Sequence, residues 1–202
     1  MHEDRGCTFV QPLRFYKYTE IQIMFSFFGK KQDELPQIID RVFISTEAKT
    51  NSILDTARNN SDLIIITWFD DSFRQLDETF NQHNLKNEIY LSRQIAAHDI
   101  QNKNVLFFEH YPLASKEDEV VERLQLKEAV FYSALDEPLF KHFGGDKIIS
   151  LMTKMGFSEN EAIEHSMVSS AIKNAQEKIS KEITVVHSAL SQADWFSKNL
   201  AK

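Results

Sequence analysis

Glycine is scarce in this chain, with 5 copies in 202 residues. Average usage would supply about 14. A loop that cradles phosphate needs several glycines within a few positions, because its backbone must approach the phosphate closely and adopt positive φ. Neither G-x-x-x-x-G-K-[ST] nor G-x-G-x-x-G occurs anywhere in the sequence. A self-sufficient P-loop nucleotide hydrolase and a Rossmann dehydrogenase are therefore excluded.

Cysteine, long apolar runs and excess positive charge are also lacking. The single Cys7 excludes an intrachain disulfide and a cysteine-rich zinc site, and favours a cytoplasmic location. The sequence contains no run of 18 apolar residues, so we expect no transmembrane segment. Contact with the periphery of the inner membrane stays open. The net charge of −7 argues against a broad nucleic-acid interface. We expect no cofactor and no bound metal, because the ligand motifs for both are missing.

Aliphatic and aromatic runs alternate with helical patterns after residue 40. The β-type runs are Val42–Ser45, Leu63–Phe69, Glu88–Leu91, Val105–Tyr111 and Ala129–Leu135. Helical patterns lie between them at Glu47–Arg58, Asp71–Gln82 and Lys116–Gln125. Because Leu63–Ile66 shows no polar alternation, we expect strands covered on both faces, in a largely parallel α/β sheet.

The region after residue 136 predicts helices only. Pro138 suits a helix start, and Gly144–Gly145 separates a short helix from one over Asp146–Met155. A long apolar stripe predicts one helix over residues 166–200, which requires a partner in this chain or in a second copy. We expect three parts: an N-terminal extension 1–35 with a native start at Met24, an α/β domain 36–143, and a helical extension 144–202.

The segment Phe131–Lys178 resembles SecA, the preprotein translocase ATPase family. Phe131–Leu139 resembles the strand and turn that close the second nucleotide-binding domain of SecA. The ordered matches that follow resemble its transition into the helical scaffold: Phe143-Gly144, Ile148, Leu151-Met152, Met155-Gly156, Ile163-Glu164-His165, Met167-Val168-Ser169, Ala171-Ile172, Ala175-Gln176 and Lys178. Val42–Lys49 and Leu63–Phe80 are similar to earlier parts of that domain, and Met24–Lys31 to the lipid-contacting SecA amino terminus. The resemblance implies a RecA-like α/β domain.

Departures from the SecA pattern imply a non-catalytic role. The first motor domain, with its Walker motifs, is absent, and Val105–Ala114 stands where SecA carries an arginine-rich segment near the γ-phosphate. The acidic segment Lys116–Glu122 follows and would oppose phosphoryl charge. We therefore expect no enzyme activity. The expected role is a modulator or adaptor of preprotein translocation that binds the translocase ATPase or its membrane complex.

Polar residues at the expected strand ends form a candidate cleft. Asp70 and Asp71 follow an apolar strand as in a Walker B motif, Arg93 follows a second strand, and Glu109 and His110 lie near the end of a third. A weak nucleotide-dependent or hydrolytic activity at this cleft is the alternative function. The simpler interpretation is that Asp70 or Asp71 caps the next helix and that the others are ordinary loop residues.

A candidate partner surface is expected in the helical extension. It comprises Glu164, His165, Met167, Trp195 and Phe196, since exposed aromatic side chains often anchor partners. The alternatives are that Trp195 and Phe196 pack inside the chain and that His165 caps or packs where the short helix meets the long one. A third function, self-association as a homodimer through the long helix, also stays open.

Overall fold

The computed structural model describes residues 36–154, 156, 158 and 160–200. The residues from Pro36 onward form one compact unit. The proposed start at Met24 and the similarity of Met24–Lys31 to a SecA amino terminus both lie outside the described residues. No helix among the described residues is both long and apolar enough to cross a membrane.

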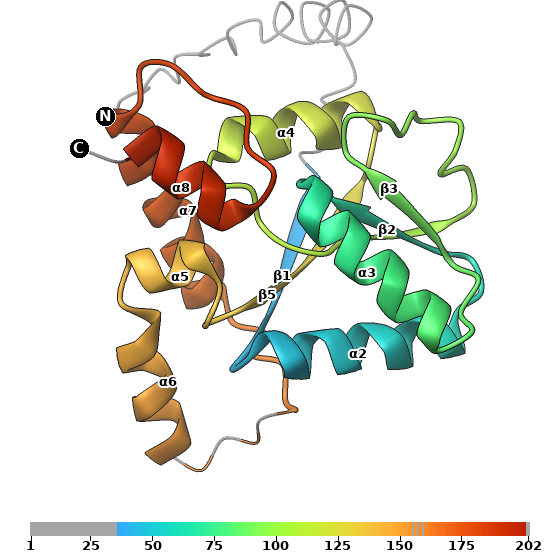
Figure 1. Cartoon of the computed structure of the whole chain (residues 1–202), viewed down its shortest axis with the longest axis horizontal. Helices are drawn as coiled ribbons and strands as arrows, with labels where there is room; N and C mark the ends of the chain where they lie inside the picture. The colour runs from blue at the N-terminus through green and yellow to red at the C-terminus, as the bar shows by residue number, and fades with distance from the viewer. Residues whose placement is uncertain (1–35, 155, 157, 159, 201–202) are drawn as a thin grey trace, which may run out of the picture. The chain divides into compact units, whose positions relative to one another are not determined.

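Five parallel strands form the central sheet in the order β1-β5-β4-β2-β3 (Figure 1). Their bounds are β1 Gln37–Phe43, β2 Leu63–Thr67, β3 Glu88–Leu91, β4 Asn104–Phe107 and β5 Glu128–Ala134. All five residues of β2 are buried, as expected for a strand covered on both faces. The predicted α/β fold of RecA-like type with a parallel sheet is therefore confirmed.

Helices cover both faces of the sheet. Side chains of α2 (Thr46–Asn59) and α3 (Asp70–Gln82) share one apolar core with Ile65 and Leu106. Side chains of α4 (Ala114–Arg123), α7 (Ser166–Glu182) and α8 (Gln192–Leu200) share the other core with Ile64 and Phe107. Ile64 and Ile65 face opposite cores because successive side chains of a strand alternate between faces.

The helical extension begins where β5 ends. Pro138 lies in the first turn of α5 (Pro138–His142), and α6 (Gly145–Lys154) follows after Gly144. Gly144 has φ +87°, a conformation that L-residues with a side chain rarely adopt. A Cβ on Gly145 would lie 2.3 Å from the carbonyl oxygen of Leu135, so this helix start requires glycine for close packing. The predicted helix break at Gly144–Gly145 is confirmed.

The single helix predicted over residues 166–200 is wrong. α7 ends at Glu182, Ile183 has extended backbone angles, and α8 begins only at Gln192. The β-branched run Ile183–Val186 has low helix propensity. The intervening segment also makes contacts that a straight helix could not make: the Leu190 carbonyl accepts from the Asp71 N–H at 2.9 Å, and the Asn199 side chain binds the backbone of His187. α8 therefore folds back onto the α/β core.

Candidate functional site

Of the five residues of the predicted cleft, three lie at the surface in ion pairs and two are buried. Asp70 binds Arg93 at 2.6 Å, and Asp71 binds Arg74 on the same helix; these four side chains are at least one-third exposed. Glu109 and His110 follow β4 and point into the protein, where they are 5% and 2% exposed. The N-cap of α3 is Phe69, so neither Asp70 nor Asp71 is the helix cap that the simpler interpretation expected. Both lie in the first helical turn, where negative charge is favoured by the helix dipole.

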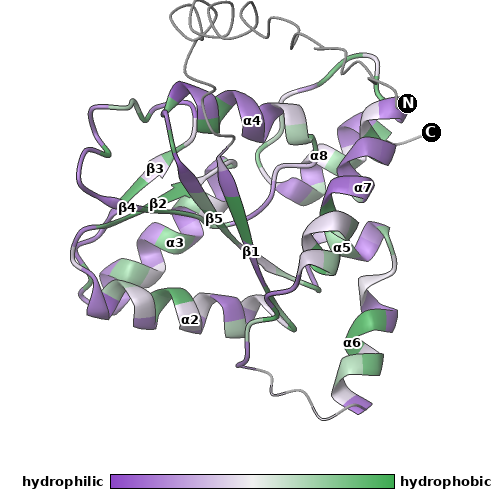
Figure 2. Ribbon diagram, turned by 180° about the vertical axis from the view of Figure 1, so that it is seen from behind, coloured by the Kyte–Doolittle hydropathy of each residue, from purple (hydrophilic) through white to green (hydrophobic). Residues whose placement is uncertain are grey.

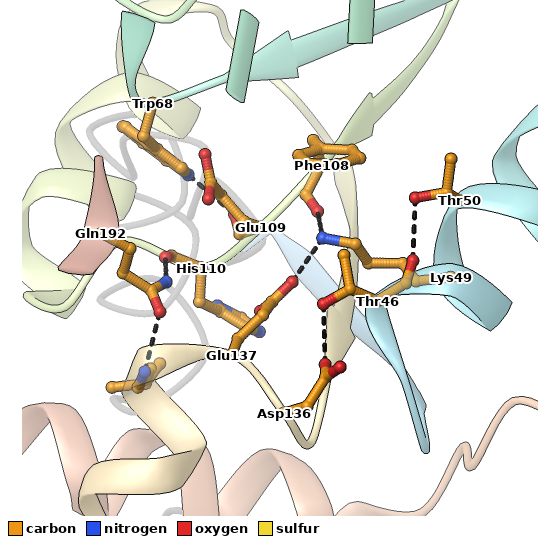
Figure 3. Close-up of polar contacts among 11 residues, drawn as sticks. Thr46, Lys49, Thr50, Trp68, Phe108, Glu109, His110, Asp136, Glu137 and Gln192 are labelled. Atoms are coloured by element: carbon orange, nitrogen blue, oxygen red, sulfur yellow. Dashed lines mark hydrogen bonds and ion pairs between the residues drawn. The ribbon is translucent and has the colours of Figure 1, made fainter. Parts of the chain in front are cut away.

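Lys49 is the centre of the first buried charge cluster. It lies on α2 in the same buried stripe as Ile53 and Ala57, and only 1% of it is exposed. Its ammonium donates to the Phe108 carbonyl at 2.8 Å, pairs with the Glu137 carboxylate, and lies 3.6 Å from the centre of the Phe108 ring (Figure 3). A buried ammonium is tolerable only with such partners, because desolvation of a lone charge is very costly.

Glu109 and Glu137 provide the negative charge around Lys49. Burial raises the pKa of Glu109 to about 7, although the charge of Lys49 acts in the opposite direction. Burial also raises the pKa of Glu137, against the same opposing effect of Lys49. The buried Oε1 of Glu109 and Oε2 of Glu137 have no hydrogen-bond partner among the described residues. Proton uptake near neutral pH would therefore relieve part of the cost of burying Glu109.

His110 is the centre of the second buried cluster. Its Nδ1 lies 2.9 Å from Glu117 and its Nε2 lies 3.0 Å from Asp40, while its ring stacks on Phe131 at 4.6 Å. Burial by itself would lower the pKa of His110, but the Glu117 and Asp40 carboxylates raise it to about 10. Burial alone would raise the pKa of Asp40, but its hydrogen bond to His110 and the charge of His110 hold that pKa below its usual value. The imidazolium is therefore held between two carboxylates at neutral pH, which fixes the loop after β4 to β1 and α4.

Side chains from α7 and α8 contact the segments that follow β4 and β5, at the carboxyl edge of the sheet. Gln192 accepts from the Leu139 N–H at 2.7 Å and donates to the His110 carbonyl at 2.9 Å (Figure 3). Gln176 donates to the Tyr111 carbonyl, and the Trp195 indole N–H donates to the Tyr111 hydroxyl at 3.0 Å. Two surface hollows lie elsewhere, one along α2 near Asp55 and the other near Asn104 and Glu128. The buried charges at the carboxyl edge thus pair with one another.

The predicted partner surface is partly corrected. Trp195 is fully buried in the core that α4, α7 and α8 share with Ile64, and Phe196 is partly buried against that core. The alternative of internal packing is therefore right for this pair. Glu164 is exposed and pairs with Arg41 at 2.6 Å. His165 is the N-cap of α7, where its Nδ1 accepts from the Met167 N–H, as the capping alternative expected. Met167 is 72% exposed, and a partner contact there stays a prediction.

Truncation of Trp195 to alanine is expected to lower the free energy of unfolding by about 3–5 kcal/mol, the usual cost of removing a large buried aromatic side chain. The loss would also release the Tyr111 hydroxyl from its hydrogen bond. Urea unfolding followed by circular dichroism measures the effect. Val185→Ala is the control, because Val185 is 63% exposed in the segment before α8. A similarly small change in both variants would contradict the packing of α8 described above.

Sequence reasoning missed Asp40, Lys49, Glu117, Glu137 and Gln192. A signal existed for Lys49, because it shares a helical face with Ile53 and Ala57 and thus lies within an apolar stripe. Glu117 and Gln192 lie in ordinary polar segments, and no local pattern distinguishes them. Among the described residues, no group of three or more His, Cys, Asp or Glu side chains is arranged to hold a metal ion.

Comparisons with known proteins find similarity to SecA over part of the chain. No protein-family model matches the sequence. Over 49 residues the chain is 51% identical to protein translocase subunit SecA 1 of Alkaliphilus metalliredigens, and over 67 residues it is 39% identical to SecA of Chlorobium phaeobacteroides. These stretches cover 24% and 33% of this chain and 6% of each relative. SecA of Desulforapulum autotrophicum is 49% identical over 49 residues, again 24% of this chain and 6% of the relative. A quarter to a third of the chain is therefore related in sequence to SecA.

Proposed function

We propose that this chain is a non-catalytic modulator or adaptor of protein translocation that acts by binding a translocase component. The sequence relation to SecA supports translocation as the process. The observation that carries the non-catalytic role is the set of buried charges at the carboxyl edge of the sheet, which pair with one another. Open α/β folds bind ligands at this edge, and here Lys49, His110 and their carboxylate partners occupy it.

The absence of phosphate-binding elements in the sequence supports the same proposal. Transfer of a phosphoryl group requires cationic groups placed against developing negative charge. In this chain the two buried cations at the edge are already paired with carboxylates, and burial separates them from solvent. The Arg93 side chain at the same edge is exposed, but it is paired with Asp70.

Calorimetry with Mg-ATP and Mg-GTP tests the non-catalytic part of the proposal. We expect no binding heat and no change in the unfolding temperature, with purified SecA from the same organism as the positive control. Saturable heat with a matching increase in thermal stability would contradict the proposal and favour the enzyme alternative.

Binding to purified SecA from the same organism tests the adaptor role. We expect a complex in light scattering and a changed rate of preprotein-stimulated ATP hydrolysis by SecA. Met167→Asp should weaken the complex by about tenfold, because it places a charge at an exposed apolar contact. Ser180→Asp, an exposed change on the same helix, is the matched control. A lack of complex formation together with an unchanged SecA rate would contradict the proposed function.

A further inference from the structure

The beginning of the helical extension carries an exposed apolar ridge formed by Phe143, Ile148 and Leu151. These side chains are 38%, 43% and 58% exposed. Ile149 and Met152, on the neighbouring face of α6, instead pack against the small core of Val42, Leu135 and Ile172. α6 follows α5 to one side of the sheet, and much of its ribbon has apolar colouring (Figures 1 and 2). α6 is therefore anchored along one face and apolar along a second face that is open.

Lysine side chains surround this ridge. At 100° per residue, Lys147 and Lys154 lie about 20° apart on the helix and adjacent to Leu151. Lys141 lies in the last turn of α5, and the ammonium of Lys178 lies 5.9 Å from the centre of the Phe143 ring. Asp146 is the one acidic residue of α6. This local excess of positive charge stands out in a chain whose net charge is −7.

We propose that the Phe143–Ile148–Leu151 ridge binds the surface of an anionic phospholipid membrane. Interfacial helices combine an apolar edge that enters the acyl boundary with lysines that contact the headgroups. Each lysine near an anionic surface contributes about 1 kcal/mol. Insertion of the apolar side chains and attraction of the lysines to the headgroups therefore act together at this ridge.

The size of the ridge favours a membrane over a protein groove. A stable protein interface covers about 800 Å² on each partner, and three partly exposed side chains, one at the end of α5 and two on α6, provide only a fraction of that area. A lipid surface has no such minimum, because it adapts to the ridge and adds attraction from every nearby lysine. The inference does not depend on the proposed translocation role, since it rests on α6 and its surroundings alone.

Flotation of the full chain with vesicles tests the proposal. We expect association with phosphatidylcholine vesicles that contain about a third phosphatidylglycerol, and weak association with pure phosphatidylcholine. Ile148→Ser with Leu151→Ser should reduce the membrane-bound fraction by about tenfold. Val185→Ser with Leu190→Ser is the matched control, because these side chains are 63% and 54% exposed outside the ridge. Lys147→Glu with Lys154→Glu should also weaken binding, and added salt should weaken it in the wild type.

Several outcomes would overturn the proposal. One is the absence of association with anionic vesicles; another is equal association with neutral ones. A third is loss of binding after Phe25→Ser, Phe27→Ser and Phe28→Ser but not after the ridge substitutions, which would place lipid contact in the amino-terminal segment. A fourth is a wild type that does not bind vesicles together with a ridge variant that no longer binds SecA, which would identify the ridge as a protein contact. Tryptophan fluorescence checks that each variant stays folded, because Trp68 and Trp195 are both buried.

Discussion

Replacement of Lys49 by methionine is expected to lower the free energy of unfolding by about 3–5 kcal/mol. Methionine nearly preserves the volume but leaves the Glu137 carboxylate buried without its cation. It also removes the positive charge that lowers the pKa of Glu109. Urea unfolding monitored by tryptophan fluorescence measures the change, since both tryptophans are buried in the folded protein.

Two further variants separate charge from packing in this experiment. Lys173→Met changes an exposed lysine on α7 and should alter stability by less than about 0.5 kcal/mol. Lys49→Met combined with Glu137→Gln should recover part of the lost stability, because a neutral amide replaces the orphaned carboxylate. Equal losses in the single and double variants would mean that the ion pair is not the source of the effect. A Lys49→Met protein as stable as Lys173→Met would contradict the cluster itself.

Replacement of His110 by glutamine is expected to produce a similarly large loss, about 3–5 kcal/mol at neutral pH. Glutamine retains some hydrogen bonding, but Asp40 and Glu117 would then lie buried without a positive charge between them. The change should release the loop after β4 from β1 and α4. Urea unfolding at pH 7 measures the loss. Replacement of the exposed His83 by glutamine is the control and should have little effect.

The pH dependence of stability distinguishes the contribution of His110 from ordinary packing. Its pKa is raised from 6.5 to about 10, so the folded state binds this proton more tightly than the unfolded state. The contribution of His110 is therefore complete below about pH 6.5 and is lost as the pH rises from there toward 10. Unfolding free energies measured across this range should decline in the wild type. The His110→Gln variant should show a flatter profile, and parallel profiles would contradict the assignment.

Glu109 adds a second dependence at lower pH. Its pKa is raised from 4.5 to about 7, so the folded state favours the protonated carboxyl. The wild type should lose about 3 kcal/mol as the pH rises from about 4.5 to 7, and Glu109→Gln should remove this slope. Because the two ranges barely overlap, the same set of unfolding curves separates the two groups. An unchanged slope in Glu109→Gln would place the titrating group elsewhere.

Most of the strands were predictable because their signal is local, although β1 begins at Gln37, five residues before the predicted run Val42–Ser45. A run such as Leu63–Ile66 indicates a buried parallel strand from its own composition. α3 was expected from the spacing of Phe73, Leu76 and Phe80, of which Leu76 and Phe80 are buried. Pro138 and Gly144–Gly145 likewise mark the ends of helices through their own backbone preferences. Each of these predictions depends on residues within a few positions of one another.

The candidate site depended on residues that are distant in sequence. Asp40 and His110 are 70 positions apart, and Lys49 and Glu137 are 88 apart. A carboxylate in a polar segment has the same local pattern whether it faces water or a buried cation. The position of α8 is a similar case, because the apolar stripe through residues 183–190 continued the helical pattern although the chain turns back there.

The sequence by itself determined that this chain forms a parallel α/β sheet with a helical extension and that it lacks a phosphate-binding loop. Local periodicity and the need of such a loop for glycine are enough for both statements. Only the tertiary structure decided that the strand-end polar residues Glu109 and His110 are buried among paired charges and that Trp195 lies in the core. The physical reason is that the cost of burying a charge depends on which partners the fold brings to it, and those partners come from other elements.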